Sequence, residues 1–274
     1  MRRVIAVLAV SVLALTACGE EEPTVTGGTG ADPCAPPPLK QAGVLTVAAE
    51  HPYYEPFLIG EQASPTGFEA DLINGIAERM GADSVEWVNI AFDQLYAPGP
   101  KEWDVGVSEI TITEERDAAV DFSEPYFEAN QGILVRADSE FASATSAEDL
   151  ADARFGAEAG TTGLAYVEEN VQPTQEVSQF DTTDIAAAAL KSGTIDVQVI
   201  DVPIAIGIRD TSADVELEVI GQFLTNEEYG LAMEEGTPLK ECVDAAIVEL
   251  KDEGILDDSQ AEWFPGSTDL PVFE

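Results

Sequence analysis

The sequence predicts an α/β fold with two lobes, and two patterns in the chain support this prediction. First, short apolar segments alternate with segments in which apolar residues recur every three or four positions, as expected for parallel sheets covered by helices. Second, the same alternation starts again after Pro125. The 274 residues, 45% of them hydrophobic, suffice for two lobes with a sizeable core.

The first half of the chain contains one clear helix among several strands. Apolar residues between Phe68 and Met80 share one face at helical spacing, which predicts a helix over 69–80 that ends at Gly81. We also expect strands at 44–49, 84–88 and 105–107, and a short helix at 92–96.

The second half repeats the pattern and finishes with a long helix at 238–253. Pro238 stands in the first turn of this helix and Gly254 follows its last residue. The other expected elements are strands at 132–135, 155–157, 195–200 and 229–233, helices that begin at 146–149 and 160–163, and a helix at 184–191.

The stretch from Asp104 to Tyr126 carries the first indication of a ligand. Thr113 is expected to cap a helix, with Glu114, Glu115 and Arg116 in its first turn. A cation in a first turn opposes the helix dipole by roughly 0.3–1 kcal/mol. Arg116 therefore either binds an anion at the junction of strand and helix or pairs with an acidic neighbour in its own turn.

The composition excludes several classes of partner. With 12 basic and 53 acidic residues the net charge is −41, which argues against binding to nucleic acid or to an anionic membrane surface. The acidic residues are spread along the whole chain, so we expect a solvated acidic shell around a folded protein. Such shells are familiar from salt-adapted organisms, and loss of stability at low salt would support this interpretation.

The N-terminus has the features of an export signal. A basic start is followed by an apolar segment at 4–15 that is too short to span a bilayer comfortably. Leu15-Thr16-Ala17-Cys18 then resembles a lipobox, the motif at which bacterial lipoproteins are cleaved and lipidated. We expect a signal peptide at 1–17 and a lipid on Cys18, which would anchor the chain without a spanning helix. The alternative is secretory cleavage after Ala17 without a lipid.

The three cysteines fit this export prediction. Residues 18–39 are rich in Gly, Pro, Thr and Glu and are expected to form a flexible tether. If Cys18 carries the lipid, Cys34 and Cys242 remain, either as a disulfide or as two isolated thiols. No Cys/His cluster has metal-ligand spacing, and His51 is the single histidine, so we predict no metal and no cofactor.

Two neighbouring motifs resemble a known family. Thr111-Ile-Thr-Glu-Glu-Arg116 followed by Asp121-Phe-Ser-Glu-Pro-Tyr126 resembles the signature of the polar amino-acid-binding family of bacterial ABC-transporter substrate-binding proteins, solute-binding family 3. Gly67-Phe-Glu-Ala-Asp-Leu72 and the aromatic pair Trp263-Phe264 also resemble parts of that family's pattern. The resemblance covers roughly residues 40–266.

The resemblance implies a two-lobed, periplasmic-binding-protein-like fold of type II in which the chain crosses twice between the lobes. The crossings would lie near 126–130 and 224–228. The implied parts are lobe 1 at 40–125 and 226–266, lobe 2 at 126–225, and a C-terminal tail at 267–274. In the family, the segments of Cys34 and Cys242 belong to the same lobe, so their pairing is feasible.

Ligands of open parallel sheets bind beyond the carboxyl ends of the strands. The resemblance implies that Arg116 binds the α-carboxylate of an amino acid together with Thr111 and Thr162, and that Asp201 accepts from its α-ammonium. The loops at these strand ends contain the full candidate set, which is Glu50, Tyr53, Tyr54, Phe92, Ser108, Glu109, Thr111, Arg116, Thr161, Thr162 and Asp201.

Several of these residues have a structural alternative. Thr161, Thr162 and Asp201 could only cap helices, and Phe92 could belong to the core. Either Tyr53 or Tyr54 would stack on the ligand together with Phe92, because the loop that carries the two tyrosines has one residue more than expected for the family.

Glu109 departs from the family pattern, which usually has a small residue at this position, often glycine. Its carboxylate either pairs with Arg116, faces a cation on the ligand with Glu50 as a second anion, or turns away from the cleft. The second alternative would indicate a ligand with a basic side chain.

The resemblance implies a monomeric, lipid-anchored receptor on the extracytoplasmic face of the cell membrane. It would capture a polar amino acid and deliver it to an ABC permease, without catalysis. Two other functions are compatible with the same fold. One is an enzyme that resembles cyclohexadienyl (arogenate or prephenate) dehydratases, with Glu109 as the acid. The other is a sensory receptor that signals through a separate membrane kinase.

Overall fold

The computed structural model describes residues 34–266 and 270–274. All of them fall within one compact unit, Asp32–Glu274. The expected signal peptide, the lipidation site at Cys18 and most of the expected tether lie outside the described residues. Across the part that is described, no helix is both long and apolar enough to cross a membrane.

The first sheet has five strands in the order β2-β1-β3-β10-β4. Strand β1 pairs in parallel with β2 and β3, whereas β10 runs antiparallel to its neighbours β3 and β4. The strands are β1 (Val44–Ala49), β2 (Ser84–Asn89), β3 (Val105–Gly106), β4 (Asp121–Phe122) and β10 (Ala232–Met233). We call this sheet and its helices lobe 1.

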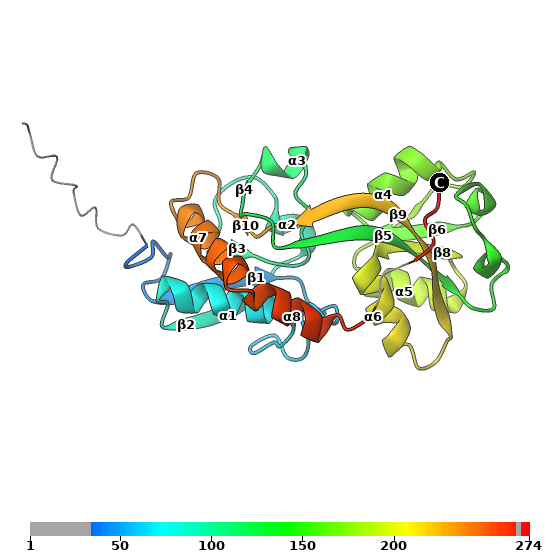
Figure 1. Ribbon diagram of the computed structural model, residues 1–274. Coiled ribbons are helices and arrows are strands. Elements are labelled where there is room, and N and C mark those ends of the chain that lie inside the picture. Colours follow the sequence, from blue (N-terminus) through cyan, green and yellow to red (C-terminus); the bar gives the residue numbers. More distant parts are fainter. Residues whose placement is uncertain (1–33, 267–269) are drawn as a thin grey trace, which may run out of the picture. The chain divides into compact units, whose positions relative to one another are not determined.

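The helices of lobe 1 cover the sheet and place the loops at its edge. Helix α1 packs against α7 and α8, as Figure 1 shows. These helices are α1 (Phe68–Met80), α2 (Phe92–Leu95), α3 (Glu114–Asp117), α7 (Leu239–Asp252) and α8 (Ile255–Trp263). Gly81 has φ +70° and ends α1, as its position in the sequence predicts.

The second sheet also has five strands, in the order β7-β6-β8-β5-β9. Its strands are β5 (Phe127–Arg136), β6 (Phe155–Glu158), β7 (Ser178–Phe180), β8 (Val197–Asp201) and β9 (Leu217–Tyr229). Its helices are α4 (Thr162–Tyr166), α5 (Thr183–Ser192) and α6 (Val202–Thr211), with short turns η1 (Glu140–Ser143), η2 (Glu148–Leu150) and η3 (Val167–Val171). We call this part lobe 2.

The sequence analysis was wrong in three details of these elements. The helix expected to begin at 146–149 is only the short turn η2, and the strand expected at 229–233 is divided between β9 and β10. The sheets are also not purely parallel, because β5 lies antiparallel to both β8 and β9. The predicted α/β fold with two lobes is confirmed.

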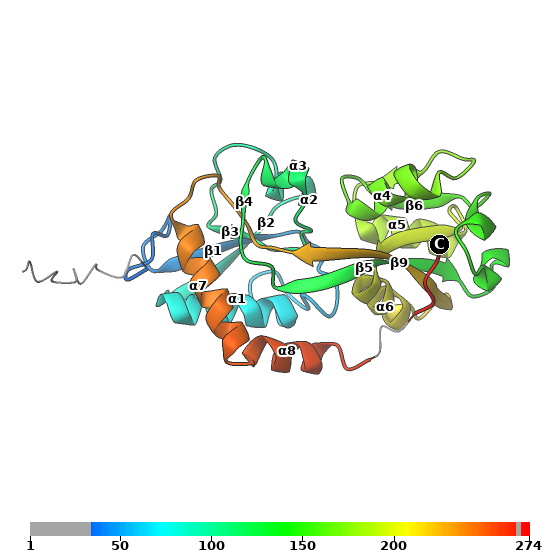
Figure 2. The ribbon, with the colours of Figure 1, turned by 45° about the horizontal axis from the view of Figure 1, so that its top comes forward.

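The connection between the lobes is a ribbon of the two long strands β5 and β9. They pair from Phe127 opposite Tyr229 to Arg136 opposite Leu217, and the register shifts twice along the way. Figure 2 shows both strands running from one lobe to the other. The crossings expected near 126–130 and 224–228 thus form one hydrogen-bonded ribbon rather than two independent strands.

The described C-terminal residues return to lobe 2, although α8 packs on lobe 1. The backbone N–H of Gln222 donates to the Pro271 carbonyl at 2.8 Å, and that of Phe273 donates to the Gln222 carbonyl at 2.9 Å. Phe273 is buried and meets Phe223 edge-on. No pattern in the sequence predicted this contact, which adds a third link between the lobes.

Two further features hold lobe 1 together. Phe127 and Tyr229 stack at 5.6 Å, and Phe264 packs against Phe127 with ring centroids 5.0 Å apart. Cys34 and Cys242 are joined as a disulfide with their Cα atoms 5.4 Å apart. The bridge ties the first described residue to helix α7.

Candidate functional site

A small cavity of about 30 Å³ lies between the lobes, at the carboxyl ends of β1, β6 and β8. This volume admits roughly one or two waters, so the lobes must separate before a solute of amino-acid size can enter. The residues that line it are Glu50, Tyr54, Phe92, Ser108, Glu109, Glu158, Thr161, Thr183, Ile200, Asp201 and Ile204. Seven of the eleven predicted site residues are among them, and Tyr53, Thr111, Arg116 and Thr162 are not.

The wall from lobe 1 is built by the loops after β1 and β3. Glu50 follows β1, and its backbone N–H donates to the Ser108 hydroxyl at 3.0 Å, which joins the two loops. The Glu50 carboxylate also accepts from the Phe92 backbone N–H at 3.4 Å. Glu50 is therefore held in place, with only 6% of its surface exposed.

Glu109 lines the cavity and does not turn away from it. Its backbone has φ +48°, a conformation that glycine adopts most readily, which gives a physical reason for the small residue expected here. Its N–H donates at 2.9 Å to the fully buried carboxyl of Glu69, which also accepts from the Tyr126 hydroxyl. No ion pair joins Glu109 to Arg116 within the described chain.

The wall from lobe 2 contains two more acidic residues. Glu158 ends β6, and its carboxylate accepts from the Thr183 backbone N–H at 2.7 Å. Asp201 ends β8 and accepts from the side-chain amide of Gln131 at 2.9 Å. Asp201 makes no capping hydrogen bond to α6, so the capping alternative for this residue is wrong.

Thr161 caps a helix and also lines the cavity. Its hydroxyl accepts from the Leu164 N–H and thereby caps α4.

Four carboxyl groups thus surround one small cavity, and their burial controls their protonation. Desolvation, followed by the charge of Glu158, raises the pKa of Glu50 to about 8. Desolvation, followed by the charge of Glu227, raises the pKa of Asp201 to about 8. Burial likewise raises the pKa of Glu109 and of Glu158. A cation in the cavity would favour the ionised form of each group.

The structure distinguishes between the two tyrosines. Tyr53 points away from the cavity, and its hydroxyl donates to the Gln62 carbonyl at 3.2 Å. Tyr54 lines the cavity, and its buried hydroxyl has no hydrogen-bond partner among the described residues. Phe92 also lines the cavity, on the side of lobe 1, and packs against a core cluster of that lobe. Tyr54, rather than Tyr53, therefore lines the cavity together with Phe92.

Arg116 lies beside the cavity rather than in its wall. Its guanidinium donates to the Thr111 carbonyl at 2.8 Å in lobe 1 and to the Gly160 carbonyl at 2.9 Å in lobe 2. It stacks on Tyr96 with 4.4 Å between its central carbon and the ring centroid. Within the described chain it forms no ion pair with its acidic neighbours, so the pairing alternative is wrong.

Thr111 and Thr162 line a second, more open cavity of about 380 Å³. Both hydroxyls donate to the carboxylate of Glu227, at 2.7 Å and 2.6 Å. Gln131 connects this group to the first cavity, because its side-chain amide donates to Glu227 and Asp201, each at 2.9 Å. One polar network therefore runs from Asp201 to the two threonines.

The comparisons with known proteins agree with this geometry. The model of the "Bacterial extracellular solute-binding proteins, family 3" matches residues 45–266. The chain belongs to this family. It is 28% identical over 231 residues to the L-cystine-binding protein TcyJ of Escherichia coli, with 82% of this chain and 84% of TcyJ covered. It is 31% identical over 202 residues to the ABC transporter glutamine-binding protein GlnH of Bacillus subtilis, with 72% of each chain covered.

Solved structures of similar proteins share the fold. An ancestral arginine-binding protein bound to glutamine superposes with a TM-score of 0.75 at 33% identity, covering 82% of this chain and all of the other. The ancestral amino acid-binding protein AncCDT-1, described as a precursor of cyclohexadienyl dehydratase, gives a TM-score of 0.70 at 31% identity, covering 81% and 95%.

The sequence analysis of this family-3 protein missed four residues of the site, which are Tyr96, Gln131, Glu158 and Glu227. Glu158 could have been found, because it directly follows the predicted strand at 155–157 and precedes the loop that begins at Gly160. Tyr96 joins the site through two tertiary contacts that the sequence does not show, the stacked Arg116 and the Gly160 carbonyl, which accepts from its hydroxyl at 3.1 Å. Gln131 and Glu227 lie within long strands, where no motif marks them.

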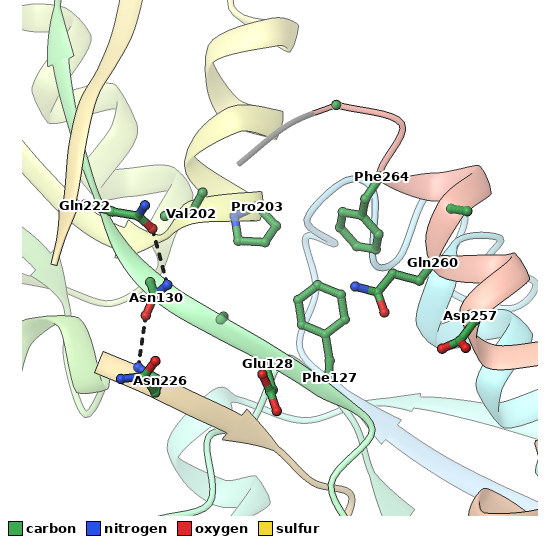
Figure 3. Close-up of a pocket in the computed structure, with 13 residues that line it drawn as sticks. Phe127, Glu128, Asn130, Val202, Pro203, Gln222, Asn226, Asp257, Gln260 and Phe264 are labelled. Atoms are coloured by element: carbon green, nitrogen blue, oxygen red, sulfur yellow. Dashed lines mark hydrogen bonds between the residues drawn. The ribbon is translucent and has the colours of Figure 1, made fainter. Parts of the chain in front are cut away.

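A larger cavity of this family-3 protein, of about 520 Å³, lies beside the connecting ribbon. Figure 3 shows Phe127, Asn130, Pro203 and Phe264 around it. Asn130 accepts from the backbone N–H of Asn226 at 2.9 Å and thereby ties the two strands together. None of the predicted site residues lines this cavity. This cavity is therefore separate from the predicted site.

Proposed function

We propose that this chain is the substrate-binding component of an ABC importer and that it binds a free amino acid with a basic side chain in the cleft between its lobes. The observation that carries this proposal is the set of four carboxyl groups around one buried cavity, Glu50, Glu109, Glu158 and Asp201. The named relatives are amino-acid-binding proteins, including components of ABC transporters.

The charge of the cavity favours a ligand with two cationic groups. A buried carboxylate is stable only when a cation or several hydrogen-bond donors compensate its charge. An α-ammonium group would compensate Asp201, as the family resemblance implies. Glu50 and Glu158 approach each other from opposite lobes, and each contributes to the pKa of the other. A second cation, on the side chain of the ligand, would compensate this pair.

The aromatic walls support the same orientation. The aliphatic part of a basic side chain would lie between Tyr54 and Phe92, and the π-face of each ring attracts a nearby cation. The α-carboxylate would then point toward Arg116, the cation nearest to the cavity. In this arrangement the ligand contacts both lobes and its binding favours the closed conformation.

Delivery to a permease would proceed from the cell surface. The signal peptide at 1–17, the lipid on Cys18 and the tether at 18–39 would place the folded part on the extracytoplasmic face of the membrane. There the closed, ligand-bound monomer would dock on its ABC permease. In that compartment the disulfide between Cys34 and Cys242 would be stable.

The residue ranges of the lobes are also part of the proposal. We assign lobe 1 to 40–125 and 226–266, lobe 2 to 126–225, and the C-terminal tail to 267–274. The strands of the two sheets support these ranges, except that the last residues of β9, 226–229, extend from the second sheet into the range of lobe 1.

The named relatives are binding proteins, so we assign no catalytic role to the site. The raised pKa of Glu109 is the property that a general acid needs, but burial among other carboxyl groups accounts for it without a reaction.

Isothermal titration calorimetry of the purified chain at high salt tests the proposal. We expect L-arginine or L-lysine to bind at least tenfold more tightly than L-glutamine or L-cystine. Tighter binding of glutamine or cystine would contradict the basic side chain, and no binding of any amino acid would contradict the function itself. Glu158→Gln should weaken the basic ligand selectively, whereas Glu168→Gln, which changes a glutamate away from the cavity, should not.

A further inference from the structure

Glu227 is a carboxylate of the protein itself that holds the two threonines expected to bind the ligand. It lies on β9, near the end that enters lobe 1. One of its oxygens accepts from the Thr111 hydroxyl at 2.7 Å and from the Thr162 hydroxyl at 2.6 Å. The other accepts from the side-chain amide of Gln131 at 2.9 Å.

Each threonine hydroxyl can donate to Glu227 or to a ligand, but not to both at once. A threonine hydroxyl has a single proton to donate. While Thr111 and Thr162 donate to Glu227, neither hydroxyl can donate to a carboxylate of the ligand. The side chains on which the family resemblance bases carboxylate recognition are therefore engaged by the protein, one from each lobe.

Arg116, the third group expected to bind the ligand's carboxylate, also has partners within the protein. Arg116 donates to the carbonyls of Thr111 and Gly160 and does not line the small cavity. A ligand carboxylate that approached Arg116 would also approach Glu227, whose charge acts on both Arg116 and Asp201. Two like charges in a site of low polarity repel each other strongly. The cationic end of a ligand meets the opposite situation, with four carboxyl groups around it.

We propose that Glu227 determines specificity by occupying the threonine hydroxyls, so that the ligand's carboxylate adds little to binding and the site also accepts the decarboxylated amine of its amino acid. This inference rests on the proposed function and specifies the chemical class of ligand further. The class is an organic cation with a second cationic or polar end, for which a carboxylate is optional.

The test is the ratio of two dissociation constants for a matched pair of ligands, measured by isothermal titration calorimetry with the full chain. The pairs are L-arginine with agmatine, L-lysine with cadaverine, L-histidine with histamine, and L-glutamine with 4-aminobutanamide. For the wild type we expect the amine to bind within about tenfold of its amino acid. A carboxylate that received several charge-assisted hydrogen bonds would give a ratio of roughly a hundredfold or more.

Two variants of Glu227 should restore dependence on the carboxylate. Glu227→Gln keeps the shape and removes the charge, and Glu227→Ala releases both threonine hydroxyls. We expect the ratio of amine to amino-acid dissociation constants to rise at least tenfold in Glu227→Ala. It should rise less in Glu227→Gln, because the amide oxygen can still accept from both hydroxyls. The matched control is Glu228→Gln, because Glu228 is the neighbouring residue on β9 and its side chain is exposed. It should leave the ratio unchanged.

Each other outcome has a definite meaning. A wild-type preference for the amino acid of a hundredfold or more would overturn the inference and leave the proposed function intact. The same holds if both Glu227 variants bind their ligands with an unchanged ratio. If the wild type binds none of the eight compounds, the proposed function fails and this inference fails with it. Because the readout is a ratio, a partial loss of folded protein in one variant does not alter it.

Discussion

Replacing Glu50 by glutamine should stabilise the protein without ligand and weaken its binding of a cationic ligand. Glu50 has an unperturbed pKa of 4.5, and burial with the charge of Glu158 raises the pKa to about 8. The folded state therefore retains a proton that the unfolded state loses between these two values. The contribution of this group to stability is fully present below pH 4.5 and decreases as the pH rises toward 8.

The magnitude follows from the same linkage. Each pH unit between the two pKa values costs at most about 1.4 kcal/mol of unfolding free energy. Opening of the cleft rehydrates the group without unfolding, so we expect a gain of about 1–2 kcal/mol for Glu50→Gln at pH 7. For a chain of this size that corresponds to a rise of roughly 2–8 °C in Tm. At pH 4.5 the gain should disappear.

Differential scanning fluorimetry between pH 4.5 and 8 measures this effect. The control is Glu86→Gln on strand β2, because Glu86 is exposed and does not line the cavity. A lower Tm for Glu50→Gln at pH 7, or a difference from the wild type that does not change with pH, would refute the reasoning. Binding of L-arginine or L-lysine should weaken in the same variant, because an amide cannot compensate a cation.

Three further predictions concern proton linkage and the outer contacts of the fold. Binding of a cationic ligand should release protons, so the affinity should fall about tenfold for each proton released and each unit by which the pH is lowered from 8 to 6. Calorimetry in buffers of different ionisation enthalpy measures the number of protons released, and an affinity independent of pH would contradict the prediction. Phe273→Ala should lower the free energy of unfolding in urea by about 3 kcal/mol, because it empties a buried site in lobe 2. Val272→Ala should lower it little, because Val272 is 45% exposed. Equal effects of the two substitutions would show that the segment does not pack as described. Reduction of the Cys34–Cys242 disulfide, which closes a loop with a sequence separation of 208 residues, should lower the stability by about 2–4 kcal/mol, and an unchanged Tm in dithiothreitol would argue against the bridge.

The sequence predicted the elements whose patterns are local. Helix α1 and strand β1 were found because one carries an apolar stripe and the other is a short apolar run with little polar interruption. The loops of the site were found because they follow strand ends and because their motifs resemble those of a known family. Glu50 and Asp201, from two of these loops, do line one cavity.

The part of β9 that forms the ribbon was missed for a physical reason. Its final residues, from Leu224 to Glu228, are mostly polar and partly exposed, since they form a ribbon between the lobes and not a buried sheet. Polar residues in that setting give no apolar run and no clear alternation. Glu227 and Gln131 also lie 96 positions apart, so their hydrogen bond depends on the register of two strands that the sequence does not specify.

The balance between the open and closed forms follows from the contacts that cross the cleft. Gly160 of lobe 2 accepts from Arg116 and from Tyr96 of lobe 1, and Glu227 joins Thr111 to Thr162. Polar contacts of this kind contribute only about 1 kcal/mol each in net terms, somewhat more where a charge takes part.

The buried carboxyl groups oppose closure, because each must keep a proton or lose its hydration when the lobes meet. A cationic ligand removes this opposing contribution in addition to its own contacts. Its differential affinity for the closed form can therefore exceed the sum of the hydrogen bonds that it makes, and that difference is the quantity that shifts the equilibrium between the two forms. A neutral solute of the same shape would leave the carboxyl groups uncompensated and would close the cleft far less effectively.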